Sequence, residues 1–390
     1  MTLANIRKLL TALMVSLPLS MMALSIQTAS ADKDVIHLRL METTDMHGYL
    51  MPYNYQKQKK VNRFGYALTA SLIRQARGEV KNSMLFDNGD ILEGSFLDKY
   101  IAYKGLREGE VHPVFKAMNK MDYDAATVGN HEFNFGLKFM NEALDDAHFP
   151  YVNANLYYAD DDKNPKNDVH YFRPYILLHR TLVDDKGNKH RLTIGVIGFA
   201  LTQTIHWNRN MERLSGILKA KDIYTTAKKY VPIMKKKGAD VIVALSHTGL
   251  GKPKLIFKEK NASYDLTKIK GIDAVMFGHV HRVFPGKSFA GISGVNLKNG
   301  TVNGVGVVEA GRWGDHLGII DLTLRKTAKE WKVVSSQSEA RPVFDRATGK
   351  ALVQPDPEII QAVQGDHTAA VNYLLTPTGQ FGRPRKAVNP

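Results

Sequence analysis

The chain has 390 residues, is 44% hydrophobic and contains no cysteine, with a formal charge of +15. This length can bury a large core as one big domain or two ordinary ones, and the balanced composition excludes extensive disorder. The lack of cysteine excludes a disulfide-stapled scaffold, a thiolate zinc site and a cysteine nucleophile, while the scattered basic residues without a recognisable binding module argue against a stable nucleic-acid complex.

Residues 1–31 have the pattern of a secretory signal peptide. Arg7 and Lys8 precede a mostly apolar run over 9–26, and Ala29-Ser30-Ala31 supplies a small-x-small cleavage pattern. An uncleaved membrane anchor is the alternative, but serine and proline interrupt the run and no stop-transfer charge cluster follows it. We therefore expect export and cleavage after Ala31, to the periplasm or otherwise to the medium or cell envelope. The mature chain keeps a charge of +13 and has no membrane association.

Apolar runs typical of strands alternate with helical patterns along the rest of the chain. The runs cover 35–41, 83–86, 125–128, 151–152, 192–199, 241–245 and 274–277. Leu68, Leu72 and Ala76 keep a helical spacing, and residues 221–237 place apolar side chains on one face and lysines on the other. Residues 318–325 and 331–338 resemble a strand pair. The alternation predicts an α/β fold with buried sheets.

Five of the apolar runs are followed directly by side chains that bind metals. These side chains are Asp45 and His47, Asp90, Asn130, His247, and His279 with His281. Loops beyond the carboxyl ends of strands converge in α/β proteins, so these distant residues can be neighbours. Taken singly, each histidine would be an ordinary surface or core residue. The ordered set of carboxylate, imidazole and amide ligands instead predicts a two-metal hydrolytic centre, with manganese, zinc, cobalt and iron all compatible.

In this order the segments resemble the calcineurin-like metallophosphoesterases, whose pattern is D-x-H, G-D, G-N-H-E/D, a single H, and G-H-x-H. The resemblance covers about residues 36–345. Further stretches are similar to the 5′-nucleotidase branch, and most of all to the periplasmic 2′,3′-cyclic-nucleotide 2′-phosphodiesterase/3′-nucleotidases; they are 43–48, 129–136, 151–155, 272–281 and 311–318. The resemblance implies a four-layer αββα sandwich, with two packed mixed sheets flanked by helices, and a catalytic domain over 32–353.

The resemblance also implies how the site works. One divalent ion would be held by Asp45, His47, Asp90 and His281, and a second by Asp90, Asn130, His247 and His279, so that Asp90 bridges the pair. A hydroxide held by the metals would then attack phosphorus in line with the leaving sugar oxygen. His131 would donate a hydrogen bond to the phosphate or to the leaving oxygen.

One position departs from the branch. Many 5′-nucleotidases have an aspartate three residues after the active-site histidine, whereas this chain has Asn134. An amide cannot raise the basicity of the His131 imidazole as a carboxylate would, so the catalytic role of Asn134 is expected to be weaker. Glu132 is expected to support the loop. For Arg312, Trp313 and His316, substrate contact and a structural role both stay open.

Residues 354–390 are predicted to be a helical linker and a tail, with the family's C-terminal nucleotide-binding domain absent. We expect hydrolysis of 2′,3′-cyclic nucleotides, 3′-nucleotides or other small phosphoesters, with a weak grip on the base. Two alternatives stay open. The chain could be a truncated, catalytically poor exported metal-binding module, or it could be a 5′-nucleotidase or sugar-nucleotide hydrolase. Base preference and oligomeric state are not determined by the sequence.

Overall fold

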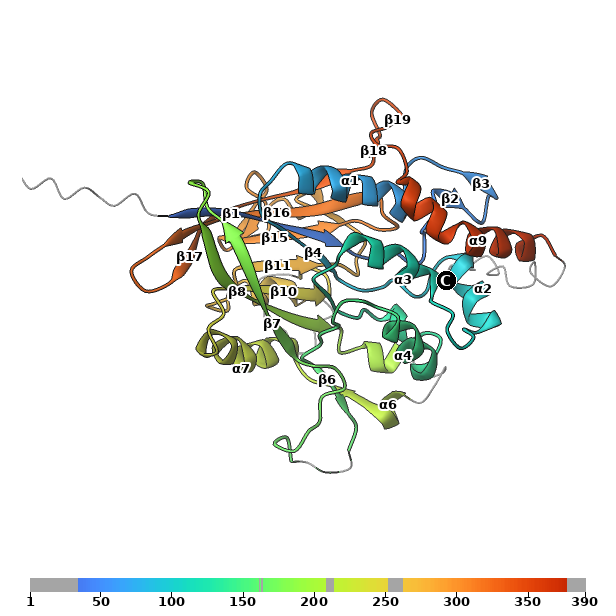
Figure 1. Ribbon diagram of the computed structural model, residues 1–390. Coiled ribbons are helices and arrows are strands. Elements are labelled where there is room, and N and C mark those ends of the chain that lie inside the picture. The colour runs from blue at the N-terminus through green and yellow to red at the C-terminus, as the bar shows by residue number, and fades with distance from the viewer. Residues whose placement is uncertain (1–33, 161, 163, 208–213, 252–261, 377–390) are drawn as a thin grey trace, which may run out of the picture. The chain divides into compact units, whose positions relative to one another are not determined.

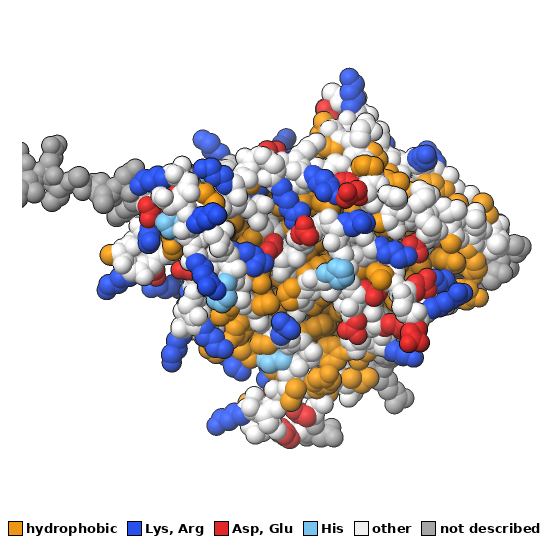
Figure 2. Space-filling model, viewed as in Figure 1, with side chains coloured by type: hydrophobic (Ala, Val, Ile, Leu, Met, Phe, Trp, Pro, Cys, Tyr) orange, Lys and Arg blue, Asp and Glu red, His pale blue; other side chains and the backbone are white. Residues whose placement is uncertain are grey.

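The computed structural model describes residues 34–376, except for 161, 163, 208–213 and 252–261. The predicted signal peptide and the tail after residue 376 lie outside these described residues. Within the described part, none of the helices combines the length and the apolar character needed to cross a membrane. Lysine and arginine are spread over the visible face with acidic side chains among them, as Figure 2 shows.

Two mixed β-sheets form the centre of the structure. The first sheet has the spatial order β17 (Trp331–Pro342), β16 (His316–Lys326), β1 (Val35–Thr43), β4 (Ser83–Asp87) and β5 (Ala125–Ala126). The main path of the second sheet is β13 (Val295–Asn296), β14 (Thr301–Val302), β15 (Val305–Ala310), β11 (Ala274–Phe277), β10 (Val241–His247), β8 (Lys189–Ala200) and β7 (Tyr175–Val183). In the first sheet β1, β4 and β5 run parallel, and in the second β8, β10, β11 and β15 do.

Three hydrophobic clusters define four layers. One cluster fills the space between the two sheets, another lies between the first sheet and α1 (Tyr66–Gly78), α3 (Pro113–Met118) and α9 (Pro357–Leu374), and the third lies between the second sheet and α7 (Ile223–Lys236). Figure 1 shows α1, α3 and α9 on one side of the sheets and α7 on the other. The expected four-layer αββα sandwich is confirmed.

The continuous apolar runs follow from burial of both faces of each sheet. In β10, Val243 and Leu245 contribute to the cluster between the sheets, whereas the alternate residues Ile242 and Ala244 contribute to the cluster under α7. Successive side chains of a strand point to opposite faces, so a strand with helices on one side and a sheet on the other needs apolar residues at every position.

The predicted helix after residue 354 is α9, and it packs into the same core as α1 and α3. Ile359, Val363, Ala370 and Leu374 are its buried residues. Ion pairs from α1 and α3 also fix it, including Lys116 Nζ to Asp366 Oδ2 at 2.8 Å. The residues from 357 to 374 are therefore part of the packed structure and not an isolated connection.

Some elements differ from the sequence expectations. The strand expected over 125–128 is only the two-residue β5, because the chain turns away toward Asn130. β7 and β15 were not predicted. β7 lies at an edge of its sheet and carries polar and charged side chains such as His179 and Arg180, so its apolar pattern is weak. β15 contains Gly306, because a side chain at this position would meet Ile320 at 2.7 Å. Glycine interrupts the apolar pattern by which a strand is recognised.

His112 is expected to make the fold less stable in mild acid. It is buried at the N-terminus of α3, where its Nδ1 accepts a hydrogen bond from the backbone N–H of Val114 at 3.2 Å. Burial lowers the pKa of His112 from 6.5 to about 3. Between these values the unfolded chain binds the proton and the folded chain does not, so stability is full above the unfolded pKa and is lost as the pH falls below it.

The free energy of unfolding should therefore fall by about 2 kcal/mol between about pH 7.5 and about pH 5 on account of this residue. Urea unfolding followed by circular dichroism, at saturating divalent metal, measures the change. His112→Asn is the matched control, because asparagine keeps a capping acceptor that does not titrate. The same pH dependence in both proteins would contradict the prediction.

Candidate metal centre

Each predicted ligand lies at or just after the carboxyl end of a strand. Asp45 and His47 follow β1, Asp90 follows β4, and Asn130 follows β5. In the second sheet His247 is the last residue of β10, while His279 and His281 follow β11. Parallel pairing brings the carboxyl ends of β1, β4 and β5 to one edge of the first sheet, and those of β10 and β11 to one edge of the second. In Figure 1 the arrows of β1, β10 and β11 point to the right, so this edge is the right-hand edge of the sheets.

Six of the seven predicted ligands form two groups of three whose ligating atoms lie within 4.8 Å of one another in each group. The first group is Asp45, His47 and His281, and the second is Asp90, His247 and His279. The groups adjoin, since His247 Nε2 lies 2.9 Å from Asp90 Oδ2 and 4.0 Å from Asp45 Oδ1.

The seventh predicted ligand, Asn130, is buried beside the second group. It lies between Gly129, where a side chain would meet Asp90 and His247, and His131, whose backbone N–H donates to Asp90 Oδ1 at 2.8 Å. Its position in the chain thus places it at the same edge of the sheet.

Two of the candidate histidines are held as metal-ligating imidazoles usually are. His47 Nδ1 donates to the Glu93 carbonyl oxygen at 2.6 Å, and His247 Nδ1 donates to the Asn88 carbonyl oxygen at 2.6 Å. A carbonyl only accepts, so these bonds fix the proton on Nδ1 and direct the Nε2 lone pair into the centre. His47 Nε2 also lies only 3.0 Å from His281 Nε2. Two ring nitrogens this close can share a cation.

The charges in the centre support the same conclusion. Burial lowers the pKa of His47, and burial together with His247 lowers the pKa of His279 to about 4, so both rings are neutral at pH 7. Burial also opposes protonation of His247, but the adjacent carboxylate of Asp90 raises its pKa to about 10. A divalent ion at Asp90 and His247 would take the place of that proton, so metal binding here releases a proton.

The backbone at the site is held in an uncommon conformation. Asp45, His47, Asp90, His279 and His281 all have positive φ, between 47° and 74°. A non-glycine residue in this region costs about 1–3 kcal/mol, and such residues gather at functional sites. Glycines before the ligands allow close approach: at Gly89, with φ of 90°, a side chain would meet the Gly129 backbone nitrogen at 2.3 Å, and at Gly278 it would meet Thr44 at 2.2 Å.

Glu132 holds the two loops of the first sheet together. Its buried carboxylate accepts backbone hydrogen bonds from Asp90 at 3.0 Å, Ile91 at 2.6 Å and Gly129 at 2.5 Å. These contacts agree with the expectation that Glu132 supports the loop.

His131 lies at the open side of the centre and pairs with a residue that the sequence did not indicate. Its Nδ1 is 2.8 Å from Glu93 Oε2, and 32% of its side chain is exposed. Burial alone would lower the pKa of His131, but Glu93 and Asp90 raise it to about 9. The backbone N–H of Asn134 donates to the carbonyl oxygen of His131 at 3.4 Å. No spacing rule could have identified Glu93, which is 38 positions before its partner.

Two packed mixed sheets whose strand ends bring carboxylates and imidazoles into one buried centre are typical of metal-dependent hydrolases. The family model for the calcineurin-like phosphoesterases matches residues 38–283, and the chain belongs to this family. Members of the family hold divalent metal ions, and the side chains described above fit that chemistry.

The chain is similar to several known proteins. It is 44% identical to the 2′,3′-cyclic-nucleotide 2′-phosphodiesterase/3′-nucleotidase of Salmonella typhimurium, over 90% of this chain and 53% of the relative. It is 42% identical to the Yersinia enterocolitica protein of the same name, over 94% of this chain and 55% of the relative. The chain thus spans about half the length of these relatives. The crystal structure of the calcineurin-like phosphoesterase YfkN from Bacillus subtilis has a TM-score of 0.81 at 36% identity, covering 88% of this chain and all of that one.

Proposed function

We propose that this protein is an exported phosphoesterase that uses two divalent metal ions to hydrolyse 2′,3′-cyclic nucleotides and 3′-nucleotides. The observation that carries the proposal is the convergence of the two three-residue groups at the strand ends. The names of the relatives at 42–44% identity support the choice of substrates. The leader-like pattern of residues 1–31 supports export to the periplasm.

In the proposed site Asp45, His47 and His281 hold one ion, and Asn130, His247 and His279 hold the other, with Asp90 between them. When bound, the ions polarise the phosphoryl group and activate water for attack. The ions are manganese, zinc, cobalt or iron, because oxygen and nitrogen ligands can bind all four metals. The neutral amide of Asn130 keeps the total negative charge low enough for an anionic substrate to approach.

His131 is proposed to protonate the leaving sugar oxygen. The Glu93 carboxylate holds the imidazole by Nδ1, so Nε2 is left to face the substrate, and the raised pKa keeps the ring protonated at pH 7. As the sugar oxygen leaves, the proton on Nε2 passes to it. Asn134 enters this proposal as a neutral residue on the same turn, which adds no charge to the pair.

A substrate panel tests the proposal. The full chain, loaded with manganese or zinc, is assayed with bis-p-nitrophenyl phosphate, 2′,3′-cyclic AMP, 3′-AMP and 5′-AMP, and phosphate release or nitrophenol is measured. We expect turnover of the first three that disappears after chelation and returns with added metal. Preference for 5′-AMP would show instead a 5′-nucleotidase. Metal binding without turnover would show a metal-binding module, and either result would overturn the proposal.

A further inference from the structure

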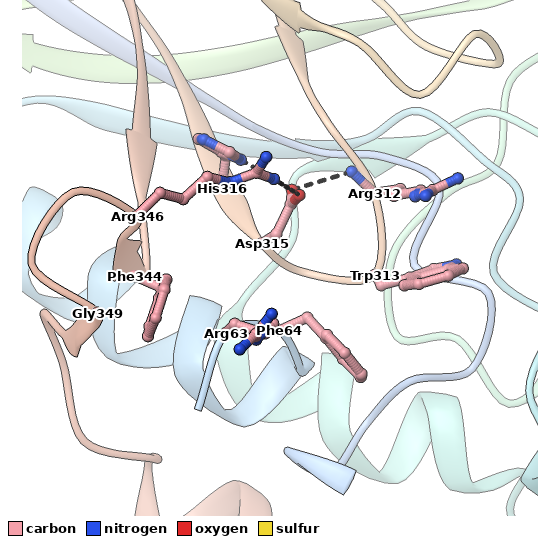
Figure 3. A pocket seen from close by; sticks show the side chains of 9 residues that line it. All are labelled: Arg63, Phe64, Arg312, Trp313, Asp315, His316, Phe344, Arg346 and Gly349. Atoms are coloured by element: carbon pink, nitrogen blue, oxygen red, sulfur yellow. Dashed lines mark hydrogen bonds and ion pairs between the residues drawn. The ribbon is translucent and has the colours of Figure 1, made fainter. Parts of the chain in front are cut away.

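A cavity of about 530 Å³ lies next to the candidate metal centre. Three segments far apart in the sequence form it: the loop before α1, the loop between β15 and β16, and the hairpin of β18 (Phe344–Asp345) and β19 (Lys350–Ala351). Figure 3 shows Arg346, Arg312 and Arg63 around the same hollow, with Phe344 on one side of it and Trp313 on the other. The volume is in the range of small-molecule sites.

The cavity and the metal centre share one wall. Arg312 Nη1 lies 3.3 Å from Nδ1 of the proposed ligand His281. The backbone N–H of Trp313 donates to the carbonyl oxygen of Asp45 at 2.8 Å, and Trp313 has a positive φ of 59°. A molecule bound at the metals therefore meets this cavity immediately beyond Arg312.

The lining of the cavity is strongly positive. Among the described residues, neither Arg63 nor Arg312 has a carboxylate within ion-pair distance, and Arg346 Nη2 lies 4.0 Å from Asp315 Oδ2. Asp315 is already engaged, since its Oδ1 accepts from the Arg312 backbone N–H at 3.0 Å and lies 2.8 Å from His316 Nδ1. The lining thus contains three guanidinium groups and one carboxylate, which leaves positive charge to be balanced by a ligand.

Two aromatic rings of the cavity each have an arginine close to one face. The Arg63 guanidinium carbon lies 5.3 Å over the Phe344 ring, and that of Arg312 lies 4.3 Å over the Trp313 ring. An arginine in this position still has N–H groups that can donate to an anion. Guanidinium N–H groups match phosphate oxygens, and the excess of positive charge favours a phosphate in this cavity.

We propose that this cavity binds a second phosphate of the substrate, and that the preferred substrates are 3′-nucleotides which also carry a phosphate on the 5′ oxygen. The inference rests on the proposed function and names its substrate class. Water adds to the 3′ phosphorus, the bond from phosphorus to the 3′ oxygen breaks, and that oxygen takes a proton. The products are inorganic phosphate and a nucleoside 5′-phosphate, which stays a dianion held by the arginines until release.

Steady-state kinetics on the full metal-loaded chain test the proposal with 3′-AMP, adenosine 3′,5′-bisphosphate and a 3′-phosphorylated dinucleotide. We expect kcat/KM for the bisphosphate to exceed that for 3′-AMP by about tenfold, mainly through KM, and this ratio to fall toward one in Arg63→Ala, in Arg346→Ala and at high salt. Arg191→Ala, an exposed arginine on β8, is the matched control and should keep the wild-type ratio. A ratio that is the same in all four proteins would overturn the proposal.

The dinucleotide separates two sources of the second phosphate. If kcat/KM for the dinucleotide exceeds that for 3′-AMP as much as kcat/KM for the bisphosphate does, an internal phosphodiester is enough to bind the arginines. A preference for the bisphosphate alone would show that a terminal 5′ phosphate is required. In both cases the arginine dependence supports the proposal, and its absence contradicts it.

A binding measurement keeps this inference separate from the proposed activity. Trp313 lines the cavity, so quenching of tryptophan fluorescence by adenosine 3′,5′-bisphosphate in chelator-treated protein reports binding without turnover. Binding that weakens about tenfold in Arg63→Ala and Arg346→Ala, in a chain that hydrolyses no nucleotide, would retain the cavity site and reject the proposed function. Hydrolysis of 3′-AMP without arginine-dependent binding of the bisphosphate would reject the cavity site alone.

Discussion

Replacing Asp90 with asparagine should lower turnover of 3′-AMP by more than about a hundredfold. Removing a residue that only contacts a metal ligand costs about 10- to 100-fold, and loss of a ligand itself should cost more. Asp90 Oδ2 lies 2.9 Å from His247 Nε2, and Oδ1 accepts the His131 backbone N–H at 2.8 Å, so the carboxylate is held inside the centre. An amide keeps the shape but loses the charge that offsets the cations. We therefore expect elemental analysis to find fewer divalent ions per chain in the variant.

The control for this change is Asp185→Asn, an exposed aspartate that pairs with His37 far from the centre. It should keep both the wild-type metal content and the wild-type rate. Full metal content together with full activity in Asp90→Asn would refute the assignment of Asp90. A loss of folding is recognised separately by circular dichroism, and in that case Asp90→Glu, which restores the carboxylate, should recover part of the metal content.

Replacing Glu93 with glutamine should lower kcat for 3′-AMP by about tenfold or more, and by less for p-nitrophenyl phosphate. Glu93 acts on His131 as a positioning residue, through the 2.8 Å contact to Nδ1. A sugar alkoxide is a poor leaving group and needs the proton from His131, whereas nitrophenolate leaves without it. Because Glu93 raises the pKa of His131, its loss should also move the high-pH decline of activity to lower pH.

Metal content should not change in Glu93→Gln, because the bond that His47 makes at this position goes to the backbone oxygen of Glu93 and not to its side chain. Glu330→Gln, on an exposed turn, is the matched control. The role of Glu93 would be disproved by equal losses for both substrates with an unshifted pH profile. Additive effects of Glu93→Gln and His131→Gln would disprove it as well. If the two residues act as one unit, the double variant should lose no more activity than His131→Gln alone.

The positions of the candidate ligands at strand ends could be predicted from the sequence because each candidate follows an apolar run directly. Asp45, Asp90 and His279 come two or three residues after the strands that place them, so local sequence fixes both the strand and the side chain beyond its end. Burial of both sheet faces made those runs continuous and easy to recognise. The edge strand β7, with polar residues on its exposed side, gave no such signal.

Side-chain partners from separate loops could not be predicted in this way. Glu93 lies after β4 and His131 after β5, and their contact depends on how the two loops pack against Glu132. The positive φ angles of Asp45 and Asp90 likewise depend on neighbours that hold the backbone in a costly conformation. Neither feature has a sequence period or motif.

The sequence by itself determined the ligand types, their order, and the family to which they point, because those depend on residue identity and on short spacings after strands. Only the tertiary structure decided that His131 pairs with Glu93 and that Arg63, Arg312 and Arg346 face one cavity beside the centre. Hydrogen bonds and charge interactions act over a few ångströms, so contacts between residues tens or hundreds of positions apart exist only once the loops are packed.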